Sequence, residues 1–354
     1  MYRAHILAFS LIFLALIAHG QATLRPPQGA FSRGDDAPPS SSPSLENARK
    51  LAASGHLEDA MVQLNELASQ VPEPAGVERL RGNILYGKEE FSEAASAFAR
   101  AVTQDPSDRE STGMEGLSLF RLGHSKEALP LLEKARGEVD VAGNDSEYVL
   151  GLCYAEAGRY DDARTAFAKQ YGFNADSAEA YVLAARLFFR RKHFKEASTQ
   201  AHKALDMKPT LPLVHQLLGE IDLANDNLPE AINELETESS INPMNGGTYE
   251  RLGDALLRSN RLAESQQALE RAILLEPATT SPYILLGQLH LLAKQPVRAI
   301  QYLILVARMD PSNFRTHFLL AHAYKETGQV AESDRELKIY KELQQNQEPH
   351  APEK

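Results

Sequence analysis

Small residues mark a repeating pattern of apolar and polar positions along this chain. Glycine recurs at spacings of 34, 35, 68, 34 and 34 residues, at Gly82, Gly116, Gly151, Gly219, Gly253 and Gly287. Ala185 stands in the place that the series skips, and steps of 34 residues beyond either end reach Ala48 and Ala321. A fixed period of this kind is typical of repeat architectures. We therefore predict nine repeats, which begin near residues 41, 75, 109, 144, 178, 212, 246, 280 and 314.

Each repeat carries a second small residue 12 positions after the first. This second series is Ala60, Ala94, Ala128, Ala163, Ala197, Ala231, Ser265, Ala299 and Ser333. Four positions further on, eight of the nine repeats have a larger apolar residue, such as Leu64 or Phe98. Six repeats end near a proline, which stops a helix because the residue before it is disfavoured in helical backbone. Because helices approach closely where small side chains meet a partner, the pattern predicts two packed helices in each repeat.

The two small-residue series, the apolar places and the prolines resemble the tetratricopeptide repeat, over about residues 44–345. The resemblance implies an all-α fold, a right-handed α-solenoid of about nine helix-turn-helix repeats. It also implies a concave groove lined by the first helices, and protein or peptide binding without catalysis. The family's large aromatic residue near the start of the repeat is present here only as Tyr181, Tyr249 and Tyr283.

Prolines and one insertion interrupt the pattern. One residue is inserted between the third and fourth repeats, and Pro130 falls inside the second helix of the third repeat. An internal proline removes a backbone donor, so we expect a kink or a local loosening around residues 126–145. Pro229, Pro282 and Pro296 can each stand at a helix start. The last helix, near residues 330–345, is strongly polar and is expected to cap the array.

Charge and cysteine content exclude several functions. The formal net charge is −11, and an acidic chain is a poor general binder of nucleic acid or anionic lipid, so we expect no nucleic-acid partner. The one cysteine, Cys153, cannot form an internal disulfide and is expected as a buried packing residue.

No motif points to a catalytic, metal or cofactor site. Residues 82–89 nearly fit a phosphate-binding loop, but Glu89 stands where a hydroxyl must hold magnesium. His317 and His322 are five residues apart on one predicted helix and so face different directions. We therefore expect no bound metal, no cofactor and no enzymatic activity.

The N-terminal residues have the form of an export signal. Arg3 precedes an apolar run of about 13 residues, shorter than the ~20 that a membrane-spanning helix needs. We expect residues 1–20 to be a cleaved signal peptide, which would place the protein in the periplasm or outside the cell without a membrane span. Residues 21–43, rich in proline and serine, are predicted to be a flexible linker, and residues 346–354 a disordered tail.

One face of the first helices is the candidate binding surface. Residues three before, one after and four after the small residue lie roughly 40–100° to one side of it, on a common face. We call these positions the A-helix face. Our candidate binding residues there are Arg79, Asn83, Tyr86, Phe120, Tyr148, Arg186, Phe189, Gln216, Glu220, Glu250 and Asp254. The alternative is that some of these rings pack against the adjacent first helix.

Two basic features lie on this face or in the turn that follows it. Arg79 and Asn83 resemble the start of the carboxylate clamp of chaperone-binding family members, but Met114, Asp145 and Val149 occupy the places where further basic or amide residues are needed. We therefore do not expect a clamp. The basic residues between Arg190 and Lys195 fit either a solvated turn or a site for an acidic ligand.

The leading hypothesis is an exported protein-interaction scaffold that binds a peptide or partner protein in its groove. The alternative is a structural accessory subunit of a cell-envelope assembly or polysaccharide export machine. The sequence leaves the partner and the oligomeric state open.

Overall fold

The computed structural model describes residues 43–137 and 146–347. The predicted signal peptide, all but the last residue of the predicted linker and most of the predicted tail lie outside these ranges. Within them the secondary structure is helical, and no strand occurs. None of the helices in these ranges is long and apolar enough to cross a bilayer.

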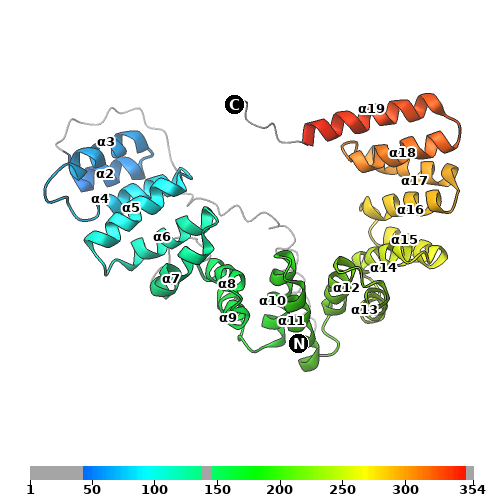
Figure 1. Cartoon of the computed structure of the whole chain (residues 1–354), viewed down its shortest axis with the longest axis horizontal. Helices are drawn as coiled ribbons and strands as arrows, with labels where there is room; N and C mark the ends of the chain where they lie inside the picture. Colours follow the sequence, from blue (N-terminus) through cyan, green and yellow to red (C-terminus); the bar gives the residue numbers. More distant parts are fainter. Residues whose placement is uncertain (1–42, 138–145, 348–354) are drawn as a thin grey trace. The chain divides into compact units, whose positions relative to one another are not determined.

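The helices follow one another in pairs, as the repeat predicts (Figure 1). The pairs in the described residues are α2 (Leu45–Ala53) with α3 (Leu57–Ala68), α4 (Val77–Gly87) with α5 (Phe91–Gln104), α6 (Arg109–Arg121) with α7 (Ser125–Ala135), α8 (Ser146–Glu156) with α9 (Tyr160–Gln170), α10 (Ala178–Arg190) with α11 (Phe194–Met207), α12 (Val214–Ala224) with α13 (Leu228–Ile241), α14 (Gly246–Arg258) with α15 (Leu262–Leu275), α16 (Ser281–Leu292) with α17 (Pro296–Met309), and α18 (Phe314–Glu326) with α19 (Val330–Gln347). The all-α repeat fold is therefore confirmed.

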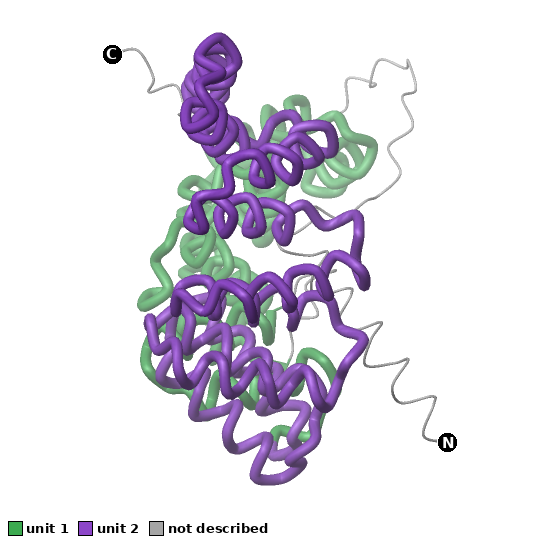
Figure 2. Tube along the Cα trace, turned by 90° about the vertical axis from the view of Figure 1, so that its right-hand side faces the viewer, with its two compact units in different colours: residues 1–175 green, residues 176–354 purple. Residues whose placement is uncertain are grey.

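The chain divides into two compact units (Figure 2). The N-terminal unit, Met1–Ala175, contains α2 to α9, and the C-terminal unit, Asp176–Lys354, contains α10 to α19. In each unit the strongest packing is between the two helices of one repeat and between consecutive repeats. This nearest-neighbour packing is the hallmark of a solenoid.

The glycine series is explained by contact with the second helix of the same repeat. A Cβ atom added to Gly151 would lie 2.4 Å from the ring of Phe167, and one added to Gly253 would lie 2.5 Å from Leu269. Both partners stand 16 residues after their glycine and are fully buried. Ser265, the second small residue of its repeat, donates a hydrogen bond to the Gly253 carbonyl at 2.7 Å. The two small-residue series thus set the distance between the paired helices.

Prolines stand in the first turns of three helices and inside a fourth. Pro229, Pro282 and Pro296 stand in the first turns of their helices, as predicted. Pro130 lies inside α7, which continues to Ala135. Because Pro130 is exposed, water can replace the backbone donor that it lacks. The loosening around residues 126–145 stays a prediction, because residues 138–145 are not among those described; the boundary between the two units lies at Ala175.

The last repeat ends in aromatic as well as polar residues. The helix α19 is mostly polar and exposed, but its Tyr340 ring lies 5.4 Å from that of Phe318 and 6.2 Å from that of Phe314. In the preceding repeat the same place is held by Val306, which packs against Leu320 of the following helix. The predicted polar helix therefore also contributes an aromatic contact, because Tyr340 packs against Phe314 and Phe318.

Candidate interaction face

The eleven candidate residues lie on six first helices, α4, α6, α8, α10, α12 and α14. Asn83 is exposed, and the other ten are partly buried, so none is a fully buried core residue. In the C-terminal unit each first helix also contacts the next first helix, from α10 to α18. The A-helix face of that unit is therefore one connected surface of partly exposed side chains.

In the N-terminal unit, Arg79 is held by neighbouring acids. Its guanidinium lies 3.4 Å from Asp108 and 3.5 Å from Glu110. Asp108 is also the N-cap of α6, where its side chain accepts a hydrogen bond from the Ser111 amide at 3.0 Å. Because its charge is already balanced at the start of the next first helix, Arg79 is a poor candidate for a clamp.

Tyr86 belongs to a cluster that sequence reasoning identified only in part. Its ring meets that of Phe91 edge-on at 5.3 Å, and the Arg121 guanidinium lies 4.8 Å above the Phe91 ring. Burial raises the pKa of the Tyr86 hydroxyl, and the nearby charge of Arg121 opposes this rise. Phe91 and Arg121 were missed because neither stands at an A-helix-face position, although Arg121 directly follows Phe120.

Two other rings of the face, Tyr148 and Phe189, pack against the second helix of their own repeat. Tyr148 lies 5.8 Å from Phe167, the ring that packs against Gly151, and Phe189 lies 5.6 Å from Phe194. These contacts differ from the alternative that we considered, in which rings pack against the adjacent first helix. Tyr148 and Phe189 each pack against a ring of the second helix and keep part of their surface exposed.

Polar side chains connect the first helices of the C-terminal unit. Thr248 donates a hydrogen bond to Gln216 at 2.9 Å, and Gln216 donates one to Glu220 at 2.9 Å. Arg251 lies 3.4 Å from Glu220 and donates to Glu250 at 2.8 Å. These contacts join α12 to α14 in one polar network, to which Glu250 is attached through Arg251.

Asp254 differs from its acidic neighbours. Within the described residues its carboxylate forms no hydrogen bond or ion pair. Burial raises its pKa, while the charges of Arg258, Arg251 and Arg315 oppose this rise. Asp254 is thus the acid of this face that is best able to accept a new donor.

Arg186 sits at the entry to α12, beside a buried carboxylate that the sequence analysis did not identify. Arg186 donates a hydrogen bond to the Leu213 carbonyl at 3.1 Å, and the Leu213 amide donates to Glu238 at 2.8 Å. Burial lowers the pKa of Arg186 to about 10, although Glu220 and Glu238 oppose this effect. Leu213 has a positive φ of 67°, which is costly for a side chain of this kind. Glu238 occupies a place that is alanine in several other repeats, and this substitution was the available signal.

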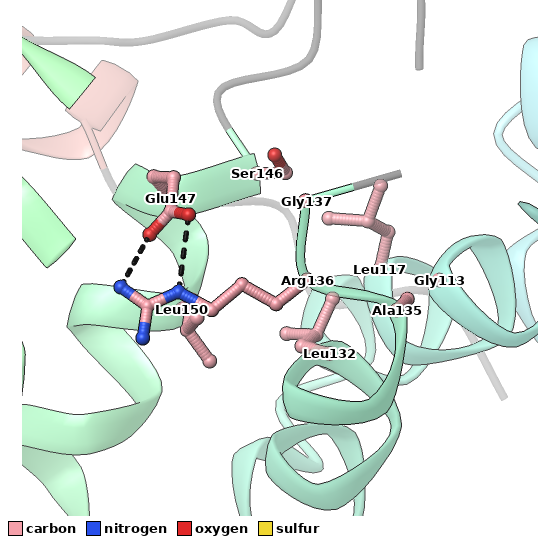
Figure 3. Close-up of a pocket in the computed structure, with 9 residues that line it drawn as sticks. All are labelled: Gly113, Leu117, Leu132, Ala135, Arg136, Gly137, Ser146, Glu147 and Leu150. Atoms are coloured by element: carbon pink, nitrogen blue, oxygen red, sulfur yellow. Dashed lines mark hydrogen bonds and ion pairs between the residues drawn. The ribbon is translucent and has the colours of Figure 1, made fainter. Parts of the chain in front are cut away.

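A shallow hollow lies beside the third and fourth repeats (Figure 3). Leu117, Leu132 and Leu150 form its apolar wall, and Arg136 donates two hydrogen bonds to Glu147, at 3.1 and 3.0 Å. Burial raises the pKa of Glu147, but the hydrogen bonds from Arg136 and Lys169 outweigh it and hold that pKa below its ordinary value. The hollow borders residues 138–145, which are not described, and we assign no ligand to it.

The remaining sequence candidates behave as follows. Cys153 is buried, as expected. His317 is also buried, and its two ring nitrogens lie 2.6 Å from Glu336 and 3.0 Å from the Pro311 carbonyl. No group of three potential metal ligands occurs among the described residues. The residues from Arg190 to Lys192 are exposed, which is compatible with both interpretations of the basic turn.

Family models and solved structures identify the repeat. One tetratricopeptide-repeat model matches residues 45–109, 114–179 and 250–314, and a second matches residues 154–221. No curated protein matches this chain. The solved structure of YrrB, described as a TPR protein with an unusual peptide-binding site, is 18% identical, over 52% of this chain and 95% of its own, with a TM-score of 0.44.

Two further solved structures are similar. MamA from Desulfovibrio magneticus RS-1, from residue 41 to its end, is 18% identical over 49% of this chain and 98% of its own, with a TM-score of 0.46. The Cut9–Hcn1 hetero-tetramer of the APC/C is 15% identical over 82% of this chain and 57% of its own, with a TM-score of 0.47. The first family model alone spans more than half of the sequence, in the register of the paired helices. This chain therefore belongs to the tetratricopeptide-repeat family.

Proposed function

We propose that this protein is a protein-interaction scaffold that binds an extended peptide segment of a partner on its A-helix face. The observation that carries the proposal is the row of partly exposed rings and polar groups on successive first helices. Aromatic and arginine side chains are the usual carriers of interface energy. A face built on packed helices exists before the ligand arrives, which reduces the entropic cost of binding.

The two units offer different chemistry to a ligand. In the N-terminal unit the face presents Tyr86, Phe120 and Tyr148, which favour apolar ligand side chains. In the C-terminal unit it presents Glu250 and Asp254 near Arg251, which favour polar and cationic ligand groups.

Chemical footprinting of bound peptide tests this proposal. The ligand is a peptide selected for binding to this chain from a displayed library of random sequences, and the readout is hydroxyl-radical oxidation of side chains with and without that peptide. We expect oxidation to fall at Tyr86, Phe120 or Phe189. Exposed leucines on second helices, Leu274 and Leu305, serve as internal controls and should not change. Protection limited to the second helices would overturn the proposal.

We further propose that the scaffold acts outside the cytoplasm. The support is the apolar run that follows Arg3, which lies outside the described residues. N-terminal sequencing of protein recovered from the periplasm or medium should give a first residue near 21–23. Recovery of exported protein that still carries residues 1–20, or of cytoplasmic protein alone, would contradict the proposal.

A further inference from the structure

Arg121 is a cation without an acidic partner in the part of the chain that the structure describes. Its guanidinium is held over the face of the Phe91 ring, 4.8 Å from the centroid. A cation over an aromatic ring is attracted to it, but the ring accepts none of the five N–H groups in the way that an oxygen does. Arg121 is only partly buried, so its donors remain accessible to a ligand.

A second arginine shows how this position can be satisfied within the fold. Arg258 ends α14 just as Arg121 ends α6, at the same place in the repeat. Arg258 donates to the Leu223 carbonyl at 3.1 Å and forms an ion pair with Asp226. Glu89 is the counterpart of Asp226 in the N-terminal unit, but within the described residues it forms no ion pair with Arg121. Sequence alone would give the two arginines the same role.

The Tyr86 hydroxyl is a second donor without an acceptor. It is closed off from water, and within the described residues it makes no hydrogen bond. A buried polar group without a partner is unfavourable, so an acceptor brought by a ligand would be favoured there. The Tyr86 ring meets Phe91, the same ring that supports Arg121, at 5.3 Å. An acceptor can reach the hydroxyl only if a neighbouring side chain moves. The charge of Arg121 acts on this hydroxyl, and within the described residues the contact that holds Arg121 is the one with the Phe91 ring.

We propose that Arg121 and Tyr86, with Phe91 as their apolar support, form a subsite for one carboxylate of the bound peptide. The proposal rests on the proposed function, because it concerns the chemistry of the ligand on the same part of the N-terminal unit. The Arg121 fork donates to the carboxylate, and a shift of this side chain lets the Tyr86 hydroxyl donate to it as well. The carboxylate is either an aspartate or glutamate side chain or the C-terminus of the peptide.

The test uses peptides selected from the displayed random library against the whole chain, assayed by calorimetry. Selected peptides should contain an acidic residue or end in a required free carboxylate. Arg121→Gln should weaken their binding about tenfold or more, because a charge-assisted pair is lost. Changing the peptide's acid to its amide, or amidating its C-terminus, identifies which carboxylate is bound. For a peptide whose carboxylate has been made neutral, Arg121→Gln should have little effect on the affinity.

Two variants separate this role from a structural one. Arg258→Gln, which breaks the paired arginine of the C-terminal unit, should leave the carboxylate dependence unchanged. Tyr86→Phe should leave the unliganded chain no less stable, because it removes a hydroxyl without a partner, and yet should weaken binding of the acidic peptide several-fold. A Tyr86→Phe variant that binds with unchanged affinity would overturn the role of the hydroxyl.

The outcomes also distinguish the two proposals. Suppose that peptides protect the A-helix face in footprinting, but that Arg121→Gln lowers the affinity for acidic and amidated peptides equally, or lowers neither. The subsite is then wrong and the scaffold function stands. If selection yields only peptides that lack a required carboxylate, the subsite is wrong as well. If peptides bind without protecting the A-helix face, the proposed function itself fails.

Discussion

Replacing Leu269 with alanine should cost ~2–5 kcal/mol of local stability, the usual range for a leucine truncated in a core. Leu269 is fully buried, packs with Leu257, Leu285 and Leu286, and fills the space that Gly253 leaves open. Because repeats contact only their neighbours, amides in α14, α15 and α16 should lose protection in native-state hydrogen exchange, while those in α4 and α5 should not.

The matched control is a leucine on the same helix. Leu274 is 71% exposed and stands five residues after Leu269 on α15, so Leu274→Ala should change stability by less than ~0.5 kcal/mol. Equal losses for the two variants would mean that the assigned register of α15 is wrong. Loss of protection that extends evenly to α4 and α5 would contradict nearest-neighbour packing.

The helix pairs could be predicted because their cause is local. A small residue and its partner 16 positions later belong to one helix-turn-helix, and their contact follows from helical geometry and a short turn. Gly151 with Phe167 and Gly253 with Leu269 obey this rule. The contact of Tyr340 with Phe318 was harder to predict, because the same place in the preceding repeat holds Val306.

The chemistry of the A-helix face could be predicted only in part. The register indicates which residues lie on the face, but not which of them already have partners. Arg79 forms an ion pair with Asp108, and Arg186 donates a hydrogen bond to the Leu213 carbonyl. Arg121, in contrast, lies over the aromatic ring of Phe91. These differences depend on where the end of one helix meets the start of another, about a repeat away in sequence. A single sequence carries no direct signal for such contacts.

The paired effects of Phe120→Ala and Phe189→Ala on binding and on stability test the central claim most directly. Both rings are partly exposed on first helices, and Phe189 also contacts Phe194. If they bind ligand, each ring that the ligand covers should account for ~2 kcal/mol or more of binding free energy, the scale of an interface hot spot. This loss corresponds to roughly 30-fold in affinity.

The measurement is the affinity of each variant for a peptide selected from the displayed library, together with its melting temperature, with Leu269→Ala as the core reference. Our account predicts that at least one of the two phenylalanine variants loses roughly 30-fold in affinity. Both should melt close to the unmodified chain, whereas Leu269→Ala should melt clearly lower and bind normally while folded. The opposite result, in which both phenylalanine variants melt like Leu269→Ala and keep full affinity when folded, would contradict the assignment of the A-helix face as the binding surface.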